Sequence, residues 1–98
     1  MSYFLYRFVP RPDFPTTMTE AEAAVMHEHV AYWQDLADKG TAVVFGPVAD
    51  PVGFWGVAVV EAETPDQVQA IRAGDPVVVA GLGPVDVHPM PDAILRRS

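Results

Sequence analysis

Three histidines are the side chains of this sequence best suited to carry a proton near neutral pH, namely His27, His29 and His88. His29 lies at helical spacing with the apolar Met26 and Trp33, which places it on the buried stripe of an expected helix. An imidazole among apolar neighbours can act as a neutral base that takes up a proton and returns it. The alternative is a core histidine whose ring hydrogen bonds to one backbone carbonyl.

A catalytic histidine needs a group that orients its second ring nitrogen, and Asp75 is the best placed carboxylate. Asp75 precedes Pro76, just beyond a second expected helix on the same side of the sheet. Asp38 is a poor partner for His29, because nine positions at about 100° each bring it to the opposite side of the helix. Asp75 could instead cap the short turn after Pro76, and its two oxygens allow both roles. If His29 is a base, Asp75 is therefore the residue expected to orient it.

A metal site is not expected at these histidines. His27 and His29 are two positions apart on a helix, so their side chains diverge by about 200° and cannot chelate one ion. The sequence has no cysteine, which removes thiolate metal centres and disulfides from consideration. Proton transfer by a histidine and an aspartate requires no cofactor, and none is expected.

Further residues could hold a substrate beside the dyad. Arg7 interrupts an apolar strand and could bind an anionic group, with Arg11 as a solvated loop charge. Phe14 lies in the proline-rich segment Pro10–Thr17, which could form a lid that excludes water. Three more aromatic residues could wall a pocket, or could belong to the core or to a dimer interface. They are Trp33, Phe45 and Trp55.

The first elements that must position these residues follow from apolar spacing and from start and stop signals. A strand is expected at Tyr3–Val9 and ends at a proline. Three prolines make Pro10–Thr17 an extended loop with little freedom to become helical. A helix is expected over about Thr19–Lys39, opened by a capping box and stopped by Gly40.

The rest of the chain adds three strands and a second helix. The strands are expected at Thr41–Val48, Phe54–Ala62 and Pro84–Met90. The helix runs from the cap residue Thr64 to Gly74, and a short turn follows Asp75. The order βαββαβ predicts an α+β, ferredoxin-like unit with a four-stranded antiparallel sheet and two helices on one face.

The apolar patterning of the strands predicts a homodimer. On the first strand Tyr3, Leu5 and Val9 point to one face, and the residues between them, Phe4, Tyr6 and Phe8, point to the other. Strands that are apolar on both faces need both faces covered, and two helices cover only one. The second face must therefore meet a partner, most simply a second copy packed around a two-fold axis.

The composition restricts the class of protein. The 98 residues include six basic and 13 acidic side chains, for a formal net charge of −7. Such a chain repels phosphate backbones and anionic lipids, so neither nucleic acid nor a membrane surface is an expected partner. No apolar run approaches the roughly 18–20 residues of a membrane span, and no basic region precedes the apolar start. We expect one cytoplasmic domain over residues 1–98.

Several motifs together resemble the YCII-related domains of the dimeric α+β barrel superfamily. They are Met26-x-x-His29-x-x-Tyr32-Trp33-x-x-Leu36-x-x-x-Gly40, then Gly46-Pro47, and then Asp75-Pro76 with Ala80-Gly81 behind it. The resemblance implies a ferredoxin-like protomer whose sheets pair into a dimeric barrel. It also implies that His29 and Asp75 form the active site, as proposed for that family. Its relatives include a dehydrochlorinase of a chlorinated hydroxyquinol, muconolactone isomerase and small monooxygenases.

The sequence and the resemblance together lead to one functional hypothesis and one alternative. The hypothesis is a small-molecule enzyme of the lyase or isomerase type, dehydrochlorinase-like, acting on a cyclic or aromatic-derived substrate. The alternative is a non-catalytic module that binds a small ligand or assists a partner enzyme on the same dimeric barrel. The segment Pro10–Thr17 is longer than in the smallest family members, so the substrate need not be shared.

Overall fold

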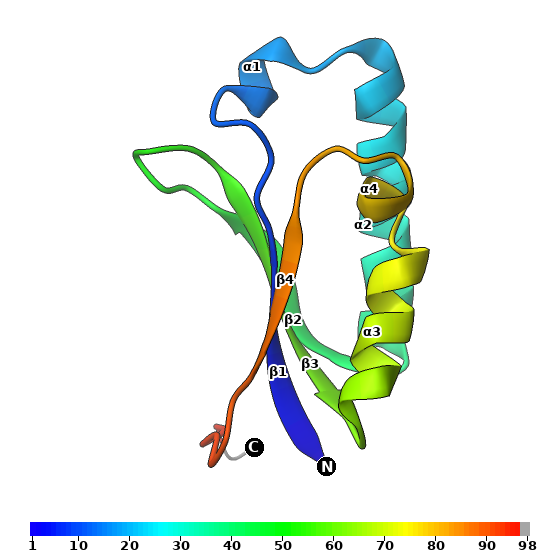
Figure 1. Cartoon of the computed structure of the whole chain (residues 1–98), viewed down its shortest axis with the longest axis vertical. Coiled ribbons are helices and arrows are strands. Elements are labelled where there is room, and N and C mark those ends of the chain that lie inside the picture. Colours follow the sequence, from blue (N-terminus) through cyan, green and yellow to red (C-terminus); the bar gives the residue numbers. More distant parts are fainter. Residues whose placement is uncertain (97–98) are drawn as a thin grey trace.

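The computed structural model describes residues 1–96, and Figure 1 shows one sheet with helices on one side of it. The strands are β1 (Ser2–Phe8), β2 (Ala42–Val48), β3 (Trp55–Ala62) and β4 (Val85–Pro89), in the spatial order β2-β3-β1-β4. All neighbouring pairs are antiparallel. The predicted α+β, ferredoxin-like protomer with a four-stranded antiparallel sheet is confirmed.

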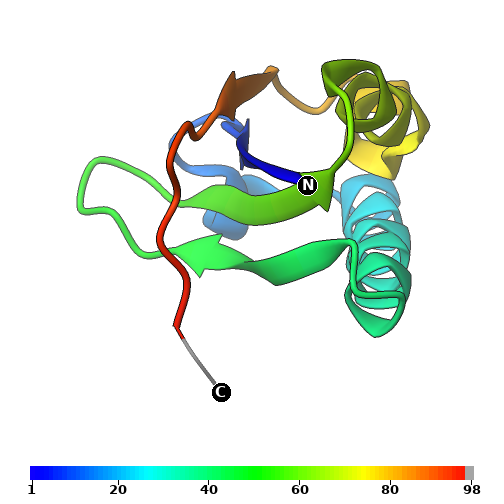
Figure 2. The same ribbon diagram turned by 90° about the horizontal axis from the view of Figure 1, so that it is seen from below.

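The helices are α1 (Phe14–Thr17), α2 (Glu20–Asp38), α3 (Pro65–Gly74) and α4 (Pro76–Val79). Figure 2 shows α2 and α3 packed against the same face of the sheet. The predicted capping box opens α2, since the Thr19 hydroxyl accepts from the Glu22 amide and the Glu22 carboxylate accepts from the Thr19 amide. Asp75 caps α4 by accepting from the Val77 amide at 3.2 Å. The caps read from the sequence thus set the helix bounds.

The prediction of an extended loop over Pro10–Thr17 is wrong at its second half, where the chain forms the single turn α1. The carbonyl of Asp13 accepts from the amides of Thr16 and Thr17, which closes the turn. Pro15 lies in the first turn of α1, where its missing N–H is not needed for a helical hydrogen bond. A proline there favours a helix start, and only a proline further inside would have opposed the helix.

The core lies between the sheet and the helices and takes its largest side chains from β1 and α2. Phe4, Tyr6 and Phe8 of β1 and Trp33 of α2 are each at most 4% exposed. The opposite face of β1 and β3 is also apolar, as predicted, but it is only half-buried. Figure 2 shows the segment after β4 running along this outer face.

Gly83 allows the chain to cross closely over the end of β1, where Pro10 begins the wall of the cavity described below. A Cβ at Gly83 would lie 2.7 Å from the Val9 carbonyl oxygen and 3.0 Å from the Pro10 Cα. We expect Gly83→Ala to lower the free energy of unfolding in urea by about 1–3 kcal/mol, because both neighbours are backbone and must shift. The control is Gly46→Ala, whose Cβ would meet nothing within 4 Å. Equal stability of the two variants would contradict this account.

Candidate active site

His29 and Asp75 meet in the core, although 46 residues separate them in the sequence. The Nδ1 atom of His29 lies 2.6 Å from Oδ1 of Asp75. α2 turns His29 toward the sheet, and the N-terminus of α4 presents Asp75 to it. His29 is 3% exposed and Asp75 is 0% exposed, so water does not compete for this contact. The pairing that the spacing predicted is therefore present.

Three further donors surround the Asp75 carboxylate. Oδ2 accepts from the Tyr6 hydroxyl at 2.7 Å and from the Trp33 indole N–H at 2.9 Å. Oδ1 accepts from the Val77 amide as well as facing His29. Burial by itself raises the pKa of the Asp75 carboxyl, but the hydrogen bonds from His29, Trp33 and Tyr6 outweigh burial and lower it. Asp75 is therefore a carboxylate at neutral pH.

Tyr6 is a residue of this site that the sequence analysis did not single out. Its ring lies 4.7 Å from the ring of Trp33, and it is 2% exposed. Burial and the hydrogen bond to Asp75 raise the pKa of the Tyr6 hydroxyl far above its usual value, so it remains a donor. The sequence did carry a signal for Tyr6, which lies between Phe4 and Phe8 on the inward face of β1. A hydroxyl buried there needs a hydrogen-bond partner, whereas an apolar side chain does not.

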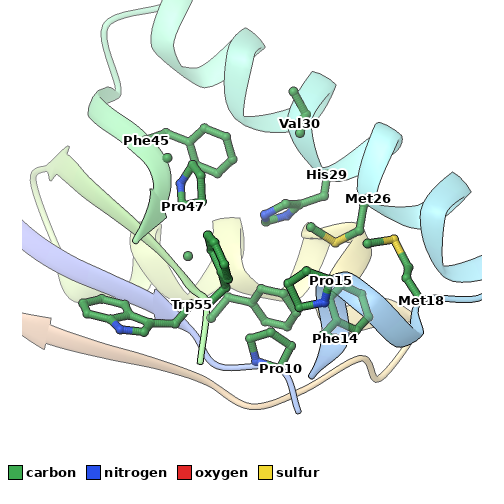
Figure 3. A pocket seen from close by; sticks show the side chains of 14 residues that line it. Pro10, Phe14, Pro15, Met18, Met26, His29, Val30, Phe45, Pro47 and Trp55 are labelled. Atoms are coloured by element: carbon green, nitrogen blue, oxygen red, sulfur yellow. The ribbon is translucent and has the colours of Figure 1, made fainter. Parts of the chain in front are cut away.

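A cavity of about 220 Å³ opens beside His29. Its lining is apolar except for His29, which is the only titratable side chain among the 14 lining residues (Figure 3). Phe45 approaches the imidazole edge-on at 5.4 Å between ring centroids, and Phe8 lies at 5.8 Å. Other lining residues come from the segment after β1, from α2, from β2, and from β3 and the residue before it. They are Pro10, Phe14, Pro15, Met18, Met26, Val30, Gly46, Pro47, Phe54, Trp55 and Gly56.

The second ring nitrogen of His29, Nε2, is the polar atom that the cavity can use. Within residues 1–96 no protein group is hydrogen-bonded to it, whereas Nδ1 is held by Asp75. No enclosed side-chain nitrogen or oxygen in this part of the chain lacks a partner, so Nε2 is not sealed off. Figure 3 shows the imidazole directed into the space between Phe45 and Met26. The site therefore offers one nitrogen in an otherwise apolar cavity.

The structure places only some of the residues predicted to bind a substrate at the cavity. Phe14 and Phe45 line the cavity, whereas Trp33 lies behind it against Asp75. Trp55 lines the rim, and its indole is turned away from His29 in Figure 3. Several lining residues, including Met18 and Phe54, were not foreseen, because loops and strand ends bring them together.

Arg7 lies on the outer face of the sheet and does not line the cavity. Its guanidinium donates to both oxygens of Asp86, at 3.1 Å and 2.7 Å, and lies 5.6 Å from the ring centroid of Trp55. This hydrogen-bonded ion pair lowers the pKa of the Asp86 carboxyl. The strand alternation that points Tyr6 and Phe8 inward points Arg7 outward, so it is not brought to the dyad.

Arg11 fastens the segment that carries Phe14. Its guanidinium donates to the Glu22 carboxylate at 2.8 and 2.9 Å, and to the hydroxyl and carbonyl of Thr17 at 2.9 Å. It also lies 4.9 Å from the ring centroid of Phe14. The hydrogen bond from Arg11, followed by that from the Thr19 amide, lowers the pKa of Glu22 to about 2. One wall of the cavity is thus tied to the first turn of α2.

Fold and site together define a small α+β protein with a buried histidine–aspartate pair beside an apolar cavity. The chain belongs to the YCII-related domain family, whose match covers residues 3–91. The fold is similar to that of 5-chloro-2-hydroxyhydroquinone dehydrochlorinase from Burkholderia phenoliruptrix in complex with 2,5-dihydroxybenzoquinone, with a TM-score of 0.66 and 24% identity. That alignment covers 88% of this chain and 90% of the dehydrochlorinase chain.

No curated protein matches the sequence. Within residues 1–96, no three histidine, cysteine, aspartate or glutamate side chains are grouped so that they could hold a metal ion. In the same part of the chain, no helix combines the length and the apolar character needed to cross a membrane.

Replacing Asp75 tests how much of the fold depends on its charge. In Asp75→Asn the side-chain amide N–H would face the groups that donate to the carboxylate in the natural chain. We therefore expect the free energy of unfolding at pH 7 to fall by about 3 kcal/mol. Folding lowers the pKa of Asp75, so its stabilising effect is present above the unfolded value of about 4 and is lost as the pH falls through the folded value. Urea unfolding between pH 7 and pH 2.5 should therefore show the two proteins converging in acid.

The matched control is Asp86→Asn, which removes a carboxylate whose pKa is also lowered but which is 41% exposed. Its expected cost is below about 1 kcal/mol, because water screens the pair with Arg7. A loss at Asp86 as large as that at Asp75 would contradict the central role of the buried carboxylate.

Proposed function

We propose that this protein is a small-molecule enzyme of the lyase or isomerase type in which His29 transfers a proton. One observation carries the proposal: the only titratable group lining an apolar cavity is a histidine backed by a buried, ionised aspartate. A cavity for binding alone needs no such pair, whereas a base needs both the free nitrogen and the charge behind it. The structural similarity to a dehydrochlorinase of the same fold supports the lyase class.

The proposed mechanism uses His29 first as a base and then as an acid. Nε2 removes a proton from a carbon or hydroxyl of the substrate, and the electron pair left behind forms a new double bond. Asp75 lies 2.6 Å from Nδ1 and stabilises the resulting imidazolium. In an elimination the bond between carbon and the leaving group breaks as the double bond forms, and His29 then passes the proton to a basic leaving group or, where chloride leaves, to solvent. In an isomerisation the electron pair shifts along the substrate and the proton returns to another substrate atom. No net proton is gained or lost by the protein.

The cavity favours a small, uncharged or weakly acidic ring compound as the substrate. Its volume of about 220 Å³ and its walls of Phe14 and Phe45 suit a flat ring. None of the 14 lining residues is a lysine or an arginine, so a carboxylate or phosphate group would have only the His29 imidazole as a polar partner. The dehydrochlorinase of similar fold holds 2,5-dihydroxybenzoquinone, which makes this flat ring a reasonable probe for the cavity.

His29→Gln is the test of this proposal, because glutamine can donate to Asp75 but cannot accept and return a proton. Activity is measured as deuterium uptake from heavy water over a panel of small hydroxylated rings, and as chloride release from 5-chloro-2-hydroxyhydroquinone. We expect His29→Gln to fold and to lose at least about 100-fold in rate. The matched control is His27→Gln, on the exposed face of the same helix, which should retain full activity.

Two outcomes would overturn the proposal. Full activity of His29→Gln would show that His29 carries no proton. Saturable binding of 2,5-dihydroxybenzoquinone, with no turnover of any panel compound, would instead support the non-catalytic binding module.

We also propose that the working unit is a homodimer formed through the outer face of the sheet. Tyr3 and Leu5 of β1 and Val57 and Val59 of β3 make this face apolar, and each is only half-buried. On β2 the neighbouring Val44 is 54% exposed. The helices pack against the other face and the segment after β4 crosses only part of this one, so a second copy would cover the side chains that stay open.

Sedimentation equilibrium at micromolar concentration tests the dimer. We expect a mass of twice 10.7 kDa for the natural chain and of 10.7 kDa for Val59→Glu, because a carboxylate on the outer face would be buried unpaired. Val52→Glu is the control, since Val52 is 84% exposed in the β2–β3 loop and should leave the mass unchanged. A natural chain that sediments as a monomer would refute the assembly.

A further inference from the structure

We infer that Tyr6 and Trp33 are positioning residues that hold Asp75 in one orientation and thereby set the tautomer of His29. In that tautomer Nδ1 carries the proton and Nε2 presents a lone pair to the cavity. The structural part of this inference concerns the free protein, and its consequence for catalysis rests on the function proposed above.

The donors around Asp75 fill all the positions at which its carboxylate can accept. Each carboxylate oxygen accepts about two hydrogen bonds, and each oxygen has two partners here. The Trp33 indole on Oδ2 and the Val77 amide on Oδ1 can only donate. The Tyr6 hydroxyl takes the remaining position on Oδ2, and the imidazole takes the remaining position on Oδ1. A proton on Asp75 could lie only on the contact to His29 or the contact to Tyr6, and the donors around the carboxylate oppose it by lowering the pKa of the carboxyl.

The tautomer follows from this arrangement. A carboxylate without a proton can only accept, so the 2.6 Å contact requires a proton on Nδ1 of His29. In the neutral imidazole Nε2 is then the unprotonated nitrogen. Because Nε2 is the ring atom that the cavity reaches, the site presents an acceptor there and not a donor. A general base requires that acceptor.

Side chains from two elements, α2 and β1, hydrogen bond to the Asp75 carboxylate from different directions. His29 and Trp33 are four residues apart on α2, so they lie on one face of the helix and reach Oδ1 and Oδ2 respectively. Tyr6 reaches Oδ2 from the central strand β1. Trp33 is 0% exposed and stacks on Phe45 at 5.5 Å with an interplanar angle of 2°, which fixes its indole. The carboxylate cannot rotate without breaking at least one of these contacts.

Loss of the donors on Oδ2 should change the chemistry of the pair. Burial favours the protonated form of a carboxyl group, and the donors oppose that effect. A protonated Asp75 could donate to Nδ1, which would move the imidazole proton to Nε2. The cavity would then meet an N–H group, and the base would be lost. Tyr6 and Trp33 thus act on the reaction through Asp75 and His29, and neither lines the cavity.

The test uses the free protein, labelled with ¹⁵N at histidine and ¹³C at the aspartate carboxyl groups, with no substrate present. In the natural chain we expect the ¹⁵N spectrum of neutral His29 to show a protonated Nδ1 and an unprotonated Nε2. In Tyr6→Phe we expect the midpoint of the Asp75 ¹³C titration to rise by about one pH unit, the size of one hydrogen bond to a charged group. Trp33→Phe should show the same direction of change.

Tyr32→Phe is the matched control. Its hydroxyl also ties α2 to a neighbour, donating to the Ile71 carbonyl at 2.8 Å, but it makes no hydrogen bond to Asp75. This variant loses a half-buried, hydrogen-bonded hydroxyl and should leave the Asp75 midpoint and the His29 tautomer unchanged. Tyr6→Phe keeps the ring and its packing, so the Asp75 midpoint of this variant tests the inference even if Trp33→Phe fails to fold.

Two results would overturn the inference: a proton on Nε2 in the natural chain, or an Asp75 midpoint in Tyr6→Phe that moves no more than in Tyr32→Phe. Neither measurement involves turnover. The inference about the tautomer can therefore be right even if the protein is not an enzyme, and it can be wrong even if the protein is one. Where a substrate is turned over, Tyr6→Phe should lower kcat about tenfold and leave KM unchanged, as expected for a residue outside the cavity.

Discussion

The structure depends on one interaction above the others, the burial of an ionised carboxylate. Asp75 loses all contact with bulk water, and its desolvation is offset only because a hydroxyl, an indole, an imidazole and an amide replace the water. These donors come from β1, α2 and the first turn of α4. Three elements that are distant in the sequence are therefore fixed around a single side chain. The same residue ends α3 through its backbone amide, which donates to the Arg72 carbonyl, and starts α4 through its carboxylate, which accepts from the Val77 amide.

The burial also explains how a fold of 98 residues can hold a histidine–aspartate pair beside an apolar cavity. The polar atoms behind His29 satisfy one another, so the cavity in front of it can be almost entirely apolar. In such surroundings water cannot screen the attraction between an imidazolium and a carboxylate, which is therefore stronger than at a surface. The fold thus separates a polar support from an apolar cavity, with one imidazole ring between them.

Much of this arrangement can be predicted from the sequence, and the failures have physical causes. The elements follow from caps and alternation, and His29 with Asp75 follows from helical spacing and from a carboxylate before a proline. Arg7 illustrates the limit, because its partner Asp86 is 79 residues away and is brought beside it only by strand pairing. Likewise, the Tyr6 hydroxyl reaches Asp75 only because β1 and the start of α4 lie side by side in the fold, and no local sequence pattern predicts that contact. The turn α1 was missed because Pro15 was counted against a helix that it begins.

Glu22 has a double role whose consequence is kinetic. One carboxylate completes the cap of α2 and also holds Arg11, which fastens the cavity wall around Phe14. Helix ends open locally far more often than a domain unfolds. Each fraying of the first turn of α2 therefore loosens that wall, and the two motions share one local opening equilibrium. The rate at which the wall around Phe14 loosens is then set by the fraying of a helix end, and not by the unfolding of the core beneath it.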